Sequence, residues 1–109
     1  MKIVKKAKKT LSIKIEIMEG KESLGQAFLY IILNEQHKKV YGILGDLFVN
    51  EEFRGQGLGT KLVKEAISEA KRRKCYKLLA TSRNTNKNLH KWYQKFGFKK
   101  HGVEFRMDF

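Results

Sequence analysis

The feature that most constrains this chain is a glycine-rich loop between an apolar run and an amphipathic segment. The run Leu44–Val49 is followed by polar residues and then by Arg54-Gly55-Gln56-Gly57-Leu58-Gly59. Apolar residues recur at helical spacing from Leu58 to Ala70. This order predicts a strand, a loop and the first turn of a helix. Alternate glycines leave backbone N–H groups accessible, and a helix N-terminus adds free donors and the positive end of its dipole, so we expect a phosphate or pyrophosphate pocket.

The loop differs from two well-known phosphate-binding sequences. The nucleoside-triphosphate loop needs Lys and then Ser or Thr directly after its last glycine, whereas Thr60 precedes Lys61 here. The dinucleotide fingerprint has Gly-x-Gly-x-x-Gly spacing, whereas the glycines here are Gly55, Gly57 and Gly59. A glycine-rich turn that merely starts a helix is the alternative interpretation.

The composition indicates one small globular domain, residues 1–109. Hydrophobic residues make up 41% of the chain and follow clear periodicities, which argues against disorder. No apolar run approaches the ~20 residues of a membrane span and no signal peptide is visible, so we expect a cytoplasmic protein without a membrane partner. The single Cys75 agrees with a reducing compartment and is interpreted as a packing residue.

The net charge of +13 favours acidic partners. Nucleic acid or an acidic protein surface stays open as a partner, beside a basic surface that is simply solvated. His37, His90 and His101 lie far apart in the sequence and form no metal-ligand pattern, so no metal site is predicted.

Periodicity along the chain predicts a sheet with helices on its faces, an α/β or α+β fold. The segment 40–49 is either one long strand or two strands broken near Gly42 and Gly45, and Gly97 is expected to end the second helix. The predicted strands are 11–17, 27–33, 40–49, 76–81 and 98–105, and the predicted helices are 58–74 and 88–96.

A second motif, residues 86–98, resembles a signature of the GNAT N-acetyltransferases: an asparagine, an apolar residue, an aromatic–tyrosine pair and Gly-Phe. The glycine loop is similar to the acetyl-coenzyme A loop of that family, with Arg54, Gly57 and Gly59 at its fixed positions. The resemblance implies a mixed, mostly antiparallel sheet flanked by two main helices. We expect Trp92, Phe96 and Phe98 to pack in the core. The second motif matches at Asn86, Leu89 (usually alanine), Trp92, Tyr93, Gly97 and Phe98.

This resemblance implies acetyl transfer from acetyl-coenzyme A to an amine on a small molecule or a protein. It places the pantetheine along one strand edge, the pyrophosphate on the glycine loop, and the cofactor arm near Asn86. Tyr93 would lie near the sulfur as the general acid, because a phenol with a pKa near ~10 stays protonated until a thiolate forms. The implied cofactor-binding residues are Leu47, Phe48, Val49, Arg54, Gly55, Gln56, Gly57, Leu58, Gly59, Thr60, Asn86 and Tyr93.

The acceptor amine also needs a base. Some family members carry a glutamate on the strand before the second motif, but alignment from Tyr93 puts Thr81 at that position. Asp46 is the best remaining carboxylate and is the expected catalytic base, with Glu51 and Glu52 as alternatives.

The chain departs from the family pattern near its start. Two helices usually separate the family's first two strands, but there is no room for them between Ile17 and Ala27. The acceptor site would then be open, suiting a macromolecule, or completed by another subunit, and a homodimer could cover the exposed sheet. The alternative function is a non-catalytic GNAT-like module that binds coenzyme A or uses its basic surface on nucleic acid or ribosomes.

Overall fold

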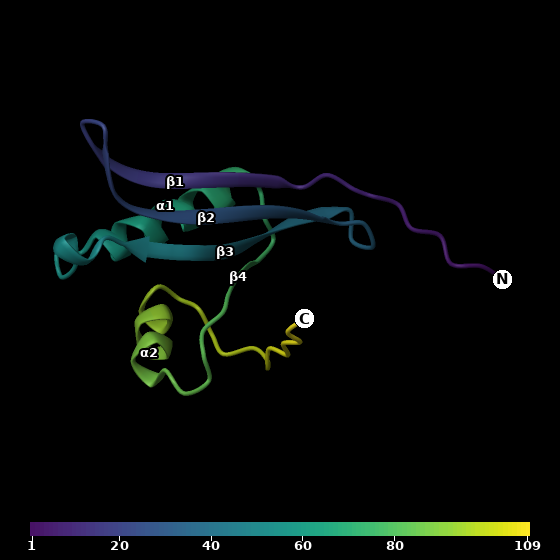
Figure 1. Cartoon of the computed structure of the whole chain (residues 1–109). Helices are drawn as coiled ribbons and strands as arrows, with labels where there is room; N and C mark the ends of the chain where they lie inside the picture. Colours follow the sequence, from purple (N-terminus) through teal and green to yellow (C-terminus); the bar gives the residue numbers. More distant parts are fainter.

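The computed structural model describes all residues 1–109 as a four-stranded sheet with two α-helices (Figure 1). The strand order is β1-β2-β3-β4, with β1, β2 and β3 antiparallel and β4 parallel to β3. The mixed α+β sheet predicted from the sequence is therefore confirmed. The elements are β1 Leu11–Glu19, β2 Glu22–Asn34, β3 Lys39–Val49, the short 3-10 helix η1 Glu51–Phe53, α1 Leu58–Arg72, β4 Leu78–Ala80 and α2 Lys87–Lys95.

The first three strands form a continuous meander. A two-residue turn, Gly20 and Lys21, joins β1 to β2, so no helix lies between these strands, as expected. β2 begins at Glu22 rather than at Ala27, because its pairing with β1 continues down to Glu22 opposite Glu19. β3 is one long strand and is not broken at its glycines.

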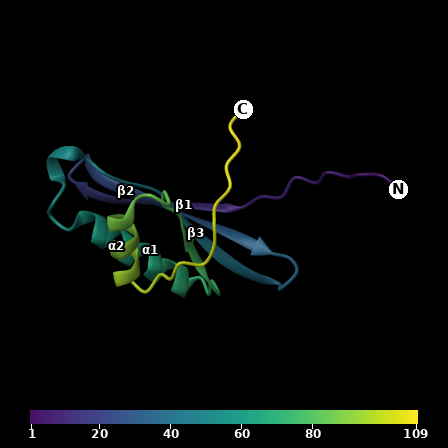
Figure 2. The same ribbon diagram turned by 90° about the horizontal axis from the view of Figure 1, so that it is seen from below.

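Both helices pack against the same core, on one face of the sheet (Figure 2). Alternate residues of β2, Ala27 and Leu29, are fully buried against that face. Leu62, Val63 and Ala66 of α1 are also fully buried, and the small alanines let the helix lie close to the strands. Trp92 and Tyr93 of α2 pack against this cluster, as do Phe96 and Phe98, which follow the helix. Core packing of Trp92, Phe96 and Phe98 was expected from the sequence.

The ends of α2 follow from two residues of the second motif. The Asn86 side chain accepts a hydrogen bond from the Leu89 backbone N–H at 3.1 Å and caps the helix N-terminus. Gly97 adopts a φ of +104° directly after the helix, as the sequence predicted for its end. Neither α1 nor α2 has the length and apolar character needed to cross a bilayer.

The predicted strand 98–105 was wrong: residues 96–109 form no helix or strand. The alternation of apolar and polar residues there indicates a two-faced segment, but a strand also needs a neighbouring strand to receive its backbone hydrogen bonds. No strand within residues 1–109 pairs with this segment, and Val103 and Phe105 are 81% and 92% exposed.

Candidate active site

The glycine loop leads into a helix that begins without a side-chain cap. Gly57 is the N-cap residue, with a φ of +79°, and Gly55 has a φ of +82°. These are left-handed conformations that favour glycine. The first turn of α1 carries no acidic residue. The free N–H groups at this helix end therefore remain available to an anion.

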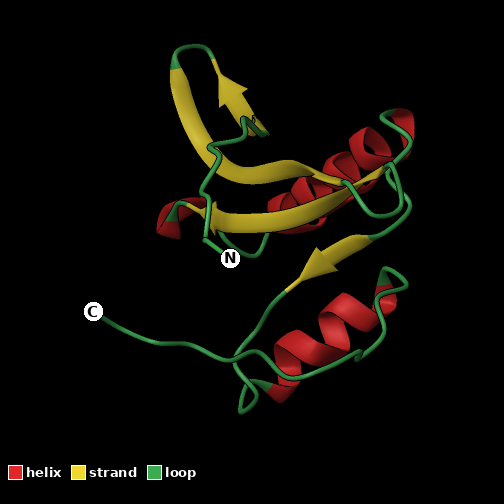
Figure 3. Cartoon of the chain, turned by 90° about the vertical axis from the view of Figure 1, so that its right-hand side faces the viewer, coloured by secondary structure: helices red, strands yellow, loops and turns green.

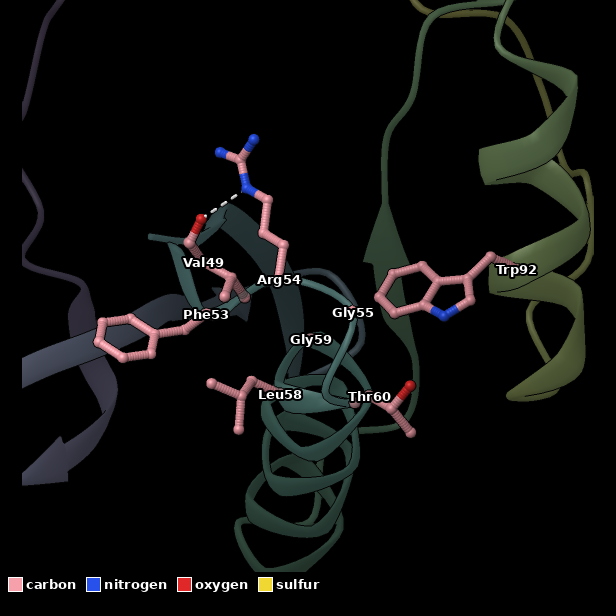
Figure 4. A pocket seen from close by; sticks show the side chains of 9 residues that line it. Val49, Phe53, Arg54, Gly55, Leu58, Gly59, Thr60 and Trp92 are labelled. Carbon is pink, nitrogen blue, oxygen red and sulfur yellow. Dashed lines mark hydrogen bonds between the residues drawn. The ribbon is translucent and has the colours of Figure 1, made fainter. Parts of the chain in front are cut away.

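An open hollow of about 210 Å³ lies in front of this helix end (Figure 4). The indole of Trp92 reaches toward the loop from α2, on the other side of the hollow. A methyl group at Gly59 would meet the Trp92 ring at 3.6 Å, which is ordinary contact, whereas Gly55 and Gly57 face open space. The lining residues are Val49, Phe53, Arg54, Gly55, Gly57, Leu58, Gly59, Thr60 and Trp92.

Arg54 connects the loop to the end of β3. Its Nε donates a 2.8 Å hydrogen bond to the Val49 carbonyl, drawn as a dashed line in Figure 4. Its guanidinium also lies 5.4 Å from the centre of the Phe48 ring, a cation–π contact. The terminal guanidinium nitrogens make no further protein hydrogen bond, so they can face a negatively charged ligand.

A β-bulge changes the direction of β3 just before this hollow. Phe28 of β2 pairs with Gly45 and Gln26 pairs with Phe48, so Asp46 and Leu47 together lie opposite a single residue, Ala27. β4 pairs with β3 only as far as Leu44 and then diverges from it (Figure 3). The edge of β3 from residue 45 to 49 therefore has no strand partner on the β4 side.

This arrangement of splayed strands, glycine loop and helix matches known proteins. The chain matches the Acetyltransferase (GNAT) family model over residues 8–98. The chain belongs to the GNAT acetyltransferase family. As predicted, the two motifs identify the family.

Individual relatives agree with the assignment to the GNAT family. The chain is 32% identical over 83 residues to N-alpha-acetyltransferase 30 of Xenopus laevis, covering 74% of this chain and 29% of the relative. It is 31% identical over 70 residues to glucosamine 6-phosphate N-acetyltransferase of Trypanosoma brucei brucei, covering 64% of this chain and 46% of that enzyme. The GNAT chain thus spans less than half the length of either curated relative.

Solved structures share the fold. An acetyltransferase from Trypanosoma brucei superposes with a TM-score of 0.80 at 26% identity, covering 90% of this chain and 69% of that one. Glucosamine-6-phosphate N-acetyltransferase from Arabidopsis thaliana superposes with a TM-score of 0.78 at 23% identity, covering 90% of this chain and 67% of that one. The latter shows likeness of fold alone.

The residues predicted for catalysis lie outside the lining of the hollow. In this GNAT chain Tyr93 is half-buried. The centroid of its ring lies 5.3 Å from the ring centroid of Trp92 and 5.4 Å from that of Phe98. Burial raises the pKa of the Tyr93 hydroxyl. That hydroxyl makes no hydrogen bond to the protein. Asn86, predicted to meet the cofactor arm, is exposed and uses its side-chain oxygen as the cap of α2.

The predicted base, Asp46, lies at the bulge with a φ of +49°. Its Oδ2 accepts a 2.6 Å hydrogen bond from the Tyr30 hydroxyl, which raises the pKa of Tyr30. The alternatives Glu51 and Glu52 are exposed on η1 and make no ion pair. Thr81 lies just after β4 and is exposed.

Two residues of the site were not predicted from the sequence. Tyr30 was expected only as part of a buried strand, and the hairpin register alone pairs it with Ile43 rather than with Asp46. Trp92 was expected in the core, and it does contact the core, but it also forms a wall of the hollow. The spacing of Gly59 and Trp92 in the sequence did not indicate their contact.

Proposed function

We propose that this chain transfers the acetyl group of acetyl-coenzyme A to an amine. The observation that carries the proposal is the position of Val49. It belongs to the free edge of β3 and also lines the hollow in front of the glycine loop. An extended ligand can therefore contact a strand edge and an anion-binding helix end at the same time, as a pantetheine arm with a pyrophosphate would.

The loop residues fit the pyrophosphate. Gly57, Leu58, Gly59 and Thr60 supply the first N–H groups of α1, and no side chain caps them. Arg54 adds a positive charge at the rim. Two negative phosphates are stabilised by such donors and by the helix dipole. The glycines leave the space that the phosphates need, since nothing lies within 4 Å of a methyl group at Gly55 or Gly57.

The strand edge fits the pantetheine. The backbone of Leu47, Phe48 and Val49 would pair with its amides as with an added strand, because β4 no longer occupies that edge. The Asn86 side chain retains its amide N–H₂ group for the cofactor arm while its oxygen caps α2. Acetyl-coenzyme A supplies the acetyl group as an activated thioester.

Two side chains would handle the protons. Asp46 would accept a proton from the acceptor amine as its nitrogen forms the new N–C bond. Tyr93 would donate its phenolic proton to the sulfur as the C–S bond breaks. Burial raises the pKa of Tyr93, which keeps the proton on the phenol until the thiolate forms.

The names of the relatives suggest acceptors to test. One is named for N-alpha acetylation and another for glucosamine 6-phosphate. We therefore propose an amine acceptor and would compare peptide α-amines with amino sugar phosphates. Titration calorimetry with acetyl-coenzyme A tests the proposal first: binding near one cofactor per chain is expected, and no binding at millimolar cofactor would refute it.

A non-catalytic module that binds nucleic acid is the second candidate. The observation that favours it is Lys77, whose Nζ lies 5.0 Å from the Tyr41 ring and 5.2 Å from the Tyr76 ring, in a chain of net charge +13. Basic and aromatic groups together suit single strands. Binding to DNA or RNA should then weaken steeply with salt, and no binding to either would remove this candidate.

A further inference from the structure

Tyr30 lies on the face of the sheet opposite the two helices. Leu29 and Ile31, on either side of it in β2, are buried against α1, so the Tyr30 side chain points the other way. Its ring stacks on that of Phe28, with the ring centroids 5.8 Å apart and the planes inclined by 10°. The ring also covers Gly45 of β3, where a methyl group would lie 2.9 Å from it. These contacts direct the Tyr30 hydroxyl toward the bulge in β3.

The bulge turns Asp46 toward this hydroxyl. Asp46 has the left-handed φ of +49° and is one of the two residues opposite Ala27. A bulge can redirect a side chain, and bulges are frequent beside active sites. Oδ2 of Asp46 accepts the 2.6 Å bond from Tyr30, and no Lys, Arg or His side chain forms an ion pair with this carboxylate. The other oxygen, Oδ1, accepts no hydrogen bond from the protein.

The bond between Tyr30 and Asp46 is not needed to join the two strands. β2 and β3 pair through their backbones on both sides of the bulge, from Gly25 opposite Val49 to Asn34 opposite Lys39. The bond lies on an exposed part of the sheet. An exposed carboxylate without a partner is hydrated and samples several rotamers. The effect of the bond is therefore on the orientation of the carboxylate.

We propose that Tyr30 is a positioning residue for acetyl transfer, because its hydroxyl holds the Asp46 carboxylate with Oδ1 free to take the proton of the acceptor amine. The inference rests on the proposed function, in which Asp46 is the base. As the amine nitrogen bonds to the acetyl carbon, its proton passes to Oδ1. The C–S bond breaks, and the thiolate takes the proton of Tyr93. Tyr30 keeps its own proton throughout, since it only donates a hydrogen bond to Oδ2. A base held in one orientation loses less freedom when the amine arrives, which lowers the barrier.

Removal of the Tyr30 hydroxyl tests this role. Tyr30→Phe keeps the ring, so the KM for acetyl-coenzyme A and the unfolding midpoint should change little. Turnover should fall by roughly 10- to 100-fold, because misplacing a reacting group by about 1 Å can cost that much. In an Asp46→Asn background, Tyr30→Phe should cause no further loss, since no base is left to position.

Ser12→Ala is the matched control for the loss of a hydroxyl. Ser12 lies opposite Tyr30 on β1, on the same face of the sheet, and is exposed. Its hydroxyl makes no hydrogen bond to the protein. Turnover of Ser12→Ala should therefore stay at the wild-type value.

Titration of the Tyr30 phenol reports the bond independently of activity. The hydrogen bond to Asp46 raises the pKa of Tyr30 above its usual value. In protein with isotope-labelled tyrosine followed by NMR, the Tyr30 resonance should titrate at lower pH in Asp46→Asn than in wild type. The signal is assigned by its absence from Tyr30→Phe. An unchanged titration would mean that the bond is absent in solution and would overturn the inference.

Different results decide the positioning role and the proposed function. Reduced turnover in Asp46→Asn with wild-type turnover in Tyr30→Phe would overturn the positioning role alone. Equal fractional losses from Tyr30→Phe with and without the Asp46 carboxylate would overturn it as well, because the hydroxyl would then act elsewhere. Unchanged acetyl transfer in Asp46→Asn would remove Asp46 as the base, and no transfer by wild type to any amine would remove the proposed function. Either result would remove this inference too.

Discussion

The Tyr30 hydroxyl donates a 2.6 Å hydrogen bond to Oδ2 of Asp46 across the bulge between β2 and β3. Gly45 makes the contact feasible, because a methyl group there would lie 2.9 Å from the Tyr30 ring. A phenol is protonated at neutral pH, so the Tyr30 hydroxyl is the donor, and the bond to Asp46 raises its pKa further. The carboxylate proposed as the base is thus held by a neighbouring strand, beside the free edge of β3.

Asp46→Asn should lower turnover by roughly 10²- to 10⁴-fold, the usual effect of removing a general base. Asn adopts left-handed backbone as readily as Asp and can still accept the bond from Tyr30, so the fold should be unchanged. Steady-state kinetics with a circular dichroism check measure both. Glu52→Gln is the matched control, since it removes one nearby exposed carboxylate. A larger loss of turnover in Glu52→Gln than in Asp46→Asn would assign the role of base to Glu52 of η1.

Gly57→Val should abolish binding of acetyl-coenzyme A. The branched side chain occupies the space in front of the helix N-terminus and resists the φ of +79°. Gly20→Val is the control: Gly20 has a φ of +59° in the turn between β1 and β2, far along the chain from the loop. Both variants should lose about 1–3 kcal/mol of stability, but only the first should lose cofactor affinity in calorimetry. Retained affinity in folded Gly57→Val would mean that the loop does not hold phosphate.

Tyr93→Phe separates catalysis from packing. The ring that contacts Trp92 and Phe98 remains, and the lost hydroxyl makes no protein hydrogen bond, so the unfolding free energy should change little. Turnover should fall by roughly 10²- to 10⁴-fold while cofactor affinity shifts much less, because the proton is needed only as the thiolate leaves. Reduced stability with unchanged turnover would instead assign Tyr93 to the core alone.

Glu69 should make stability depend on pH in acid. Its carboxylate accepts hydrogen bonds from Arg72 and from Arg73, which lower its pKa to about 2 from 4.5. A lowered pKa in the folded state adds stability that is fully present above about pH 4.5 and is lost as the pH falls toward 2. Chemical unfolding across that range should show a smaller decline for Glu69→Gln than for wild type. Glu65→Gln, one turn away and without an ion pair, should decline as wild type does.

Much of the fold could be predicted from local patterns. The 3.6-residue period located α1, strict alternation located β1, and Gly97 marked the end of α2. The two motifs together identified the family. These features depend on neighbours in the sequence, so the sequence displays them directly.

The features that could not be predicted depend on pairing between distant segments. The bulge at Asp46 and its bond to Tyr30 arise from the register of β2 with β3, which local patterns do not determine. The contact between Gly59 and Trp92 depends on how α2 docks against α1. The prediction of a strand over residues 98–105 was wrong for the same reason. Alternation of apolar and polar residues indicates that a segment has two different faces, but it does not supply a neighbouring strand for its backbone hydrogen bonds.

Acetyl transfer itself is tested most directly by a coupled product measurement. Wild-type protein is incubated with acetyl-coenzyme A and a panel of peptide α-amines, lysine peptides and amino sugar phosphates, with Gly57→Val as the control. Released thiol is quantified, and the mass of the acceptor is measured by mass spectrometry. We expect amine-dependent thiol release, with one acetyl group gained by the acceptor per thiol released, and no release with Gly57→Val. Tight binding of acetyl-coenzyme A without thiol release or acetylated product for any amine would contradict acetyl transfer and indicate a binding module.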